Sequence, residues 1–124
     1  MSTEHPDWVF NLDDQAQGIA RKLGEGLTTR IFPGDQAMLS IARIAPHSTG
    51  TLHSHPQEQW GVLLEGALVR IQGGQEVNMK VGDFWRTPGG VEHGVRTGKE
   101  SAVVLDFFAP PRDEYKKPGE GFGP

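Results

Sequence analysis

Short apolar runs separated by glycine and proline make up most of the chain. Within these runs apolar and polar residues alternate, which is the two-residue period of a half-buried strand, and helical periodicity is weak. We predict strands at 27–32, 36–45, 51–55, 59–64, 67–72, 75–81, 84–87, 93–97 and 101–109. A kink is expected at Glu65-Gly66, and Gly73-Gly74 is expected to form a two-residue hairpin loop because both glycines tolerate a positive φ. Short strands at this spacing predict an all-β sandwich or small barrel.

The two ends of the chain are expected to lie outside this barrel. Residues 13–23 have the composition of a short helical turn, which Gly18 interrupts. The last residues contain almost nothing that a core would bury, so we expect them to be mobile. The pattern therefore predicts an N-terminal arm (1–26), a barrel (27–112) and a mobile C-terminal tail (113–124).

Composition and charge narrow the class of protein. A chain of 124 residues is long enough for one hydrophobic core. Its net charge of −4 argues against nucleic acid or an anionic membrane as the main partner. No apolar run approaches the ~18 residues of a membrane helix, and the first residues do not have the pattern of a signal peptide. The chain contains no cysteine, which fits a reducing compartment, so we expect a cytoplasmic protein.

Three histidines are candidates for a metal site. His53 and His55 are two residues apart, so on a strand their side chains point to the same face. Such a pair is weak support for a metal site by itself. His93 supplies a third imidazole, after a segment whose glycines and proline bring the start of a strand into the barrel. The other two histidines, His5 and His47, lie in the arm and in a loop, and we assign them no role.

The segments that contain these histidines resemble the two motifs of the cupin family. GTLHSHPQEQWGVLLEG (50–66) is similar to the first motif and GDFWRTPGGVEH (82–93) to the second. The surrounding strand pattern extends the resemblance over roughly residues 27–112. One departure is Thr97, where cupins often have asparagine. The resemblance implies a single-domain double-stranded β-helix, or jelly-roll barrel, that binds one divalent ion: nickel, zinc, iron, manganese or cobalt.

The fourth ligand of this ion is predicted to be Gln59 rather than Glu58. In the family this ligand stands seven residues before the glycine that closes the first motif, here Gly66. Strand alternation agrees, because Gln59 lies an even number of residues after His53 and His55, and side chains at such a spacing point to the same face of a strand. Glu58 instead shares its face with apolar residues that we assign to the core: Trp60, Val62 and Leu64. A neutral amide leaves the ion its full formal charge, so the site is expected to favour a carboxylate or an enolate.

An acidic residue interrupts the apolar run at the end of the predicted barrel. Asp106 lies among alanine, valine, leucine and phenylalanine. An acid inside an apolar strand is costly to bury unless it is paired or functional. Two interpretations stay open. Asp106 forms an ion pair with Arg112 that fixes the C-terminal segment, or it takes part in catalysis.

A narrower resemblance adds to the second interpretation. A cupin with three histidines, one glutamine and the sequence D-x-F-x-P-P-R is similar to the pectin-degradation cupins of the KdgF type. The residues implicated in catalysis there match Asp106, Phe108 and Arg112. The resemblance implies an enzyme that converts a small anionic sugar, a 4,5-unsaturated uronate, to linear 5-keto-4-deoxyuronate. A metal-dependent dioxygenase and a non-catalytic sugar-binding cupin are the alternatives.

Other residues have two possible interpretations. Arg43 points either into the barrel, as a second contact for an anion, or to solvent. Trp60 and Trp85 line the mouth of the site, or they belong to the core or to a dimer contact. The apolar residues of the arm are too few for a core of their own: Trp8, Val9, Phe10 and Leu12. Since exposed sheet edges also need protection, we predict a homodimer, with the arm packed on the barrel or on the partner.

Overall fold

A computed structural model describes residues 5–121 of the chain. Within this range the elements are β1 (Ile19–Gly24), β2 (Leu27–Pro33), β3 (Met38–Ile44), β4 (Glu58–Gln72), β5 (Gln75–Lys80), β6 (Phe84–Thr87), β7 (His93–Arg96), β8 (Ala102–Ala109), a 3₁₀ turn η1 (Asp113–Tyr115) and β9 (Gly119–Glu120). The predicted all-β fold is confirmed. No helix among these residues is long and apolar enough to cross a membrane.

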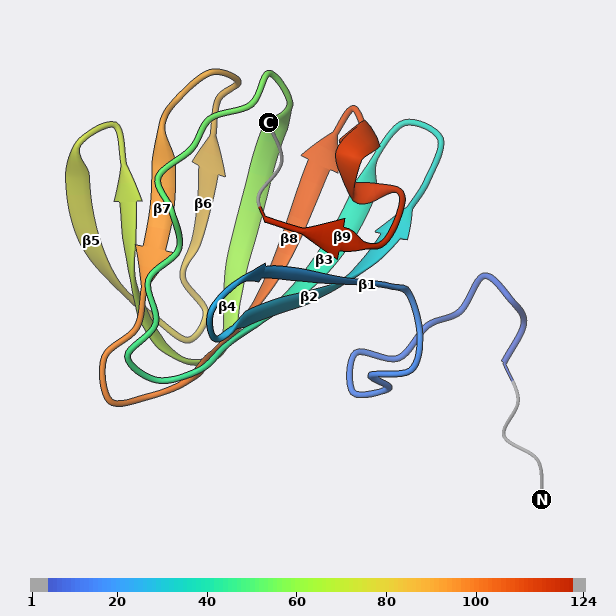
Figure 1. Cartoon of the computed structure of the whole chain (residues 1–124), viewed down its shortest axis with the longest axis horizontal. Coiled ribbons are helices and arrows are strands. Elements are labelled where there is room, and N and C mark those ends of the chain that lie inside the picture. The colour runs from blue at the N-terminus through green and yellow to red at the C-terminus, as the bar shows by residue number, and fades with distance from the viewer. Residues whose placement is uncertain (1–4, 122–124) are drawn as a thin grey trace.

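The strands form one bent sheet that wraps around the interior. Its order is β5-β4-β8-β3-β2-β1-β9, and β6 and β7 also pair with β4. Figure 1 shows β8, β3, β2 and β1 along one wall, β5, β7 and β6 along the other, and β4 between them. β4 connects the two walls, because its first half pairs with β8 of one wall and with β6 of the other, and its second half pairs with β5 and β7. This arrangement is the predicted jelly-roll barrel.

β4 bends where its neighbours change. Its register with β8 shifts between Leu63 and Glu65, next to the expected kink. Gly66 has a φ of +81°, and a Cβ there would lie 1.7 Å from the carbonyl oxygen of Ser101, so only glycine fits. The sequence pattern predicted two strands here. The structure has one, because backbone pairing continues through the bend.

The hairpin between β4 and β5 follows the prediction. Gly73 and Gly74 have φ values of +56° and +81°, as a two-residue loop of this kind requires. Strand alternation directs one set of side chains inward, and the apolar ones form the core: Leu23, Leu27, Ile31, Met38, Ala42, Ile44, Leu63, Leu68, Trp85, Ala102, Val104, Phe108 and Tyr115. The polar site lies among these side chains.

The chain before residue 27 differs from the prediction. Ile19–Gly24 is a strand that pairs antiparallel with β2, so the helical-turn interpretation is wrong for these residues. The reason is the alternation of the strand, in which Arg21 and Leu23 are buried while Ala20 and Lys22 are exposed. The sheet therefore begins at residue 19, inside the segment that we assigned to the arm.

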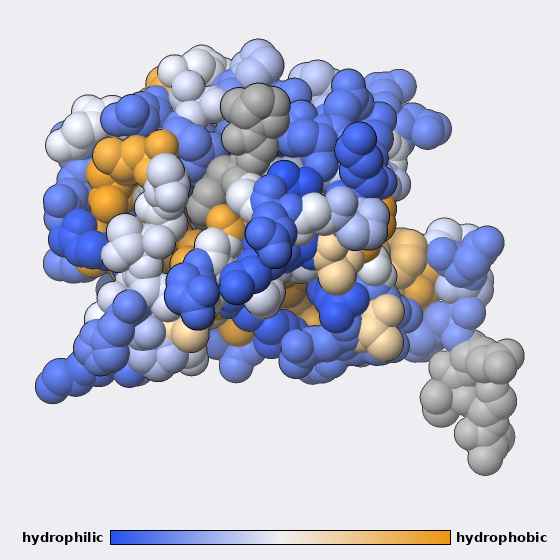
Figure 2. Space-filling model, viewed as in Figure 1, coloured by the Kyte–Doolittle hydropathy of each residue, from blue (hydrophilic) through white to orange (hydrophobic). Residues whose placement is uncertain are grey.

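The segment after the barrel also differs. η1 and β9 lie within residues 113–121, and β9 pairs parallel with β1. Tyr115 is only 2% exposed, and its ring lies 5.8 Å from that of Phe108. The expectation that this segment has almost nothing to bury is therefore wrong. Figure 2 shows hydrophilic side chains over most of the face on which η1 and β9 lie.

Candidate metal centre and active site

Three imidazole rings converge inside the barrel. The ring centroids of His53 and His93 lie 4.5 Å apart, those of His55 and His93 5.0 Å, and those of His53 and His55 5.9 Å. One ligand atom from each ring lies within 4.8 Å of the others. Residues 51–55 do not form the regular strand that we predicted. A single bridge, with reciprocal backbone hydrogen bonds of 3.0 and 2.9 Å, instead holds His53 opposite His93 at the start of β7.

The backbone fixes the orientation of each ring. Nδ1 of His53 lies 2.8 Å from the carbonyl oxygen of Thr51, Nδ1 of His55 lies 3.0 Å from that of Gln57, and Nδ1 of His93 lies 2.9 Å from that of Val91. A carbonyl oxygen only accepts, so Nδ1 carries the proton in each ring. The lone pair of the neutral ring is then on Nε2, which is the arrangement of a metal-binding histidine.

Burial keeps these imidazoles neutral. Desolvation is the main cause that lowers the pKa of His93 to about 3 and that of His53 to about 4. Burial also lowers the pKa of His55, on which the charges of Arg112 and Glu114 act in opposite directions. Neutral imidazoles with inward lone pairs are the form that binds a metal ion.

Gln59 completes the cluster from β4. Its side-chain nitrogen donates to Oδ1 of Asp106 at 3.0 Å, which directs its Oε1 toward Nε2 of His55, also at 3.0 Å. With the ring proton on Nδ1, a carbonyl oxygen and a nitrogen lone pair face each other. A cation bound by both atoms would stabilise this pair. The spacing also fits, because neighbouring ligands ~2.1 Å from an ion lie roughly 3 Å apart.

His93 provides a second indication that a metal ion fits the site. Its Nε2 is buried and has no hydrogen-bond partner among the residues that the structure describes. Leaving a buried polar atom unsatisfied costs about 1–3 kcal/mol, which coordination of an ion would offset. Three imidazole nitrogens and one amide oxygen suit a divalent transition metal.

Glu58 points away from this cluster. Its Oε2 lies 2.7 Å from Nε of Arg86 on the outer face of the sheet. Trp60 shares that face and is 42% exposed, so our assignment of this stripe to the core is wrong. Alternation predicted which side chains share a face, and the structure shows that the face with Gln59 is the inner one.

Asp106 lies on β8 beside Gln59. Burial raises the pKa of its carboxyl to about 6, although the charge of Arg70, the hydrogen bond from Gln59 and the charge of Arg112 all favour the ionised form. A carboxyl group with a pKa this close to neutral can both accept and release a proton at physiological pH.

Arg112 and Phe108 lie on the same side of the cavity. Arg112 is 1% exposed, and its guanidinium carbon lies 4.0 Å from the ring centre of Tyr115 and 5.4 Å from that of Phe108. The Phe108 ring in turn lies 5.6 Å from the ring of His55. Arg112 forms an ion pair with Glu114 at 3.1 Å, and Asp106 accepts a hydrogen bond from Gln59.

Sequence reasoning missed Arg70. This side chain is 4% exposed, donates to Oγ1 of Thr87 at 2.7 Å and lies 5.5 Å from the ring centre of Trp85. Burial lowers the pKa of Arg70 to about 10. The sequence contained an indication of this position, because Arg70 lies two residues after the buried Leu68, and so on the same face of the strand, in an otherwise apolar run.

Arg43, for which the sequence leaves two interpretations open, points outward and donates to the carbonyl oxygen of Leu12. Its solvent-facing interpretation is therefore correct.

One cavity connects these groups. Its walls include apolar side chains of β1, β2 and β3 as well as the following polar and aromatic residues: His53, Gln59, Arg70, Trp85, His93, Asp106, Phe108, Arg112 and Tyr115. Two arginines and one carboxyl group therefore face the same space as the histidines. A cavity with this charge distribution favours an anionic ligand.

The fold agrees with the comparison to known proteins. The cupin domain family matches residues 40–108, and the chain belongs to this family.

Within the family, the chain is similar to the pectin degradation protein KdgF of Dickeya dadantii (strain 3937). The two are 27% identical over 108 residues, which cover 86% of this chain and 96% of that protein. The solved structure of KdgF from Halomonas sp. has a TM-score of 0.73 and 22% identity, and covers 81% of this chain and 93% of its own. The solved structure of an RmlC-like cupin from Shewanella frigidimarina NCIMB 400 has a TM-score of 0.74 and 22% identity. The match covers 82% of this chain and 91% of that cupin. These two structures share the fold of this chain.

Proposed function

We propose that this cupin is a cytoplasmic, metal-dependent enzyme that converts 4,5-unsaturated uronate monomers from pectin or alginate to linear 5-keto-4-deoxyuronate. The observation that carries the proposal is the contact between Asp106 and Gln59, which joins an acid of raised pKa to the histidine cluster. The similarity to KdgF over most of both chains supports the substrate class. A neutral ligand set next to an acid suits proton transfer better than oxygen chemistry.

In this proposal His53, His55, Gln59 and His93 hold one divalent transition-metal ion. When bound, the ion acts as a Lewis acid for negative charge on a substrate oxygen. Since all four side chains are neutral, none of them reduces the charge of the ion. Gln59 has a second task, because its amide nitrogen holds the Asp106 carboxyl at the edge of the site.

The reaction needs one proton to leave oxygen and one to arrive on carbon. Asp106 takes the proton of the C1 hydroxyl group as the C1=O bond forms and the bond from C1 to the ring oxygen breaks. The electrons of that bond stay on the oxygen at C5, as an enolate. Asp106 then returns its proton to C4, and the C5 carbonyl forms, so the reaction is an isomerisation. Arg70 and Arg112 attract the anionic substrate, and Phe108 provides an apolar wall for the sugar.

The product in heavy water tests this function. Metal-loaded protein and an unsaturated galacturonate monomer in D₂O are expected to give linear 5-keto-4-deoxyuronate with deuterium at C4, followed by NMR as the vinyl proton disappears. Because Asp106 delivers the deuteron from one side, one C4 diastereomer should exceed the other. Equal amounts of both, formed at the rate seen in buffer, would contradict the proposal.

Replacing Gln59 with glutamate tests the value of a neutral ligand. Gln59→Glu is expected to retain the metal and to lower kcat by at least about tenfold, because a unit charge a few ångströms away is worth on the order of 1–4 kcal/mol. The added charge opposes both the enolate and the ionised Asp106. Metal content and kcat are measured together, with the exposed Gln75→Glu as a control of equal charge. Wild-type turnover in Gln59→Glu would refute the argument.

We also propose that the protein is a homodimer. Three large side chains lie on one outer face, with Trp60 42%, Phe84 70% and Phe107 40% exposed. They line one open groove, and contiguous apolar surface of this kind is typical of protein–protein contacts. Sedimentation at micromolar concentration is expected to give a dimer, and Phe84→Glu a monomer with unchanged circular dichroism. A wild-type monomer under these conditions would disprove the dimer.

A further inference from the structure

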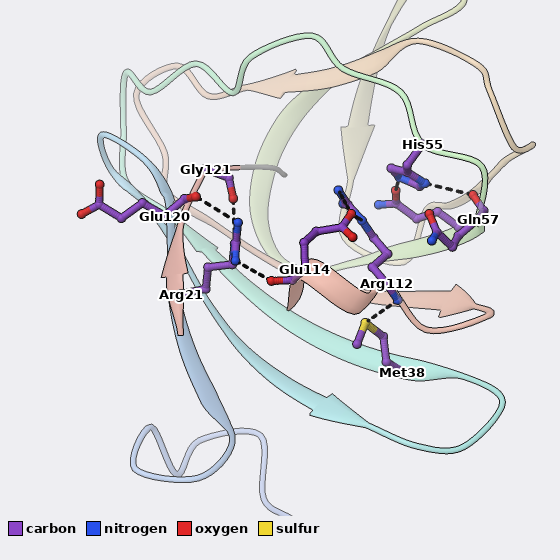
Figure 3. A network of polar contacts seen from close by, with 9 residues as sticks. Arg21, Met38, His55, Gln57, Arg112, Glu114, Glu120 and Gly121 are labelled. Atoms are coloured by element: carbon purple, nitrogen blue, oxygen red, sulfur yellow. Dashed lines mark hydrogen bonds and ion pairs between the residues drawn. The ribbon is translucent and has the colours of Figure 1, made fainter. Parts of the chain in front are cut away.

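The guanidinium group of Arg112 already binds a carboxylate of its own chain. Its Nε and its Nη2 both lie 3.1 Å from Oε1 of Glu114. The side chain of Arg112 is 1% exposed and that of Glu114 is 27% exposed. Figure 3 shows the two side chains pointing toward one another. A buried cation without a counter-charge is costly, so Glu114 stabilises Arg112 when no ligand is bound.

This ion pair lies at the site itself. Arg112 lines the cavity, and its charge and that of Glu114 both act on His55. The Nε and Nη2 edge of a guanidinium is the one that typically receives a carboxylate side-on. A ligand carboxylate that approaches this edge of Arg112 therefore meets a negative charge already in place.

The backbone around Glu114 is held independently of this ion pair. Arg21 of β1 donates to the carbonyl oxygens of Glu114 at 2.7 Å, Glu120 at 2.9 Å and Gly121 at 2.8 Å (Figure 3). The backbone N–H of Arg112 donates to Sδ of Met38 at 3.3 Å. The segment is thus fastened through its main chain, and the side chain of Glu114 can rotate away from Arg112 without moving it.

We propose that Glu114 limits the affinity of the site for carboxylate ligands by occupying on Arg112 the place of the ligand's carboxylate. A ligand carboxylate displaces it, and the partly exposed Glu114 side chain turns to solvent. A neutral sugar has no carboxylate that competes with Glu114 for Arg112, so its affinity does not depend on Glu114. This inference rests on the proposed function in one respect, that the ligand is a carboxylate sugar.

The binding of a uronate that cannot react tests the inference. D-galacturonate lacks the C4=C5 bond, so its binding to metal-loaded protein is measured by calorimetry without turnover. Glu114→Gln and Glu114→Ala are expected to bind it about tenfold more tightly than wild type. This factor corresponds to about 1.4 kcal/mol, close to the net value of one hydrogen bond to a charged group. Glu120→Gln, an exposed change of equal charge on the same segment, should leave the affinity unchanged.

The neutral methyl ester of galacturonate is the matched ligand. Its affinity should be the same in wild type and in the Glu114 variants. Galacturonate binding by both Glu114 variants that is equal to or weaker than that of wild type would overturn the inference. A gain in affinity that extends to the ester would also overturn it. Absence of galacturonate binding in every protein would also overturn it. Tighter binding in the Glu114 variants together with no turnover of the unsaturated uronate would leave this inference standing and refute the proposed reaction.

Discussion

Asp106→Asn is expected to lower the enzyme-dependent rate of uronate linearisation by about 10²- to 10⁴-fold, the usual contribution of a general acid–base group. Asparagine keeps the shape of the side chain and still accepts the hydrogen bond from Gln59, but it cannot carry a proton. The metal content should stay at the wild-type level. The rate is measured at saturating substrate, so that a change in kcat is separated from a change in binding.

The stability of this variant distinguishes lost chemistry from a damaged fold. Burial opposes the charge of Asp106, so a neutral asparagine should not lower the melting temperature. Asp35→Asn, at an exposed position between β2 and β3 that does not line the cavity, serves as the matched control and should keep the wild-type rate. An Asp106→Asn protein with the wild-type rate would rule out Asp106 as the proton carrier.

His93→Ala is expected to weaken metal binding by more than about 10²-fold, since even loss of a group that only orients a ligand costs roughly 10- to 100-fold. His93 is nearly inaccessible to solvent, and its Nε2 has no other partner among residues 5–121. Metal content after desalting should fall from about one equivalent to near zero. The rate of uronate linearisation in excess of the rate in buffer should fall with it.

The control for this variant is His5→Ala, a histidine of the arm that is exposed. It should retain both the metal and the rate. Elemental analysis measures the metal directly, and the result does not depend on which substrate the enzyme uses. A full equivalent of metal in His93→Ala would contradict the proposed ligand set.

Local patterns in the sequence predicted part of the candidate site because the first half of β4, which carries Gln59, alternates regularly. Alternation along β4 separated Gln59 from Glu58, and the glycine at 66 bends the strand where its neighbours change. The same alternation could not show which face is inside. Apolar residues such as Trp60 were therefore assigned to the core, although they form an outer surface.

Contacts between distant parts of the chain could not be predicted in this way. β9 is two residues long, and it exists because Gly119 and Glu120 pair with β1, almost one hundred residues earlier. Arg21 contacts the same segment, and no local pattern connects the two. Arg70 could have been found, because it breaks an apolar run as Asp106 does.

The loss of ultraviolet absorbance by an unsaturated uronate monomer tests the central claim most directly. The C4=C5 bond conjugated to the carboxylate absorbs, and linearisation with ketonisation destroys this chromophore. Because the ring also opens without a catalyst, the quantity measured is the rate in excess of buffer. The account predicts an excess rate proportional to protein concentration, abolished by a chelator and restored by adding a divalent transition metal. A rate equal to that of buffer with fully metal-loaded protein would contradict it.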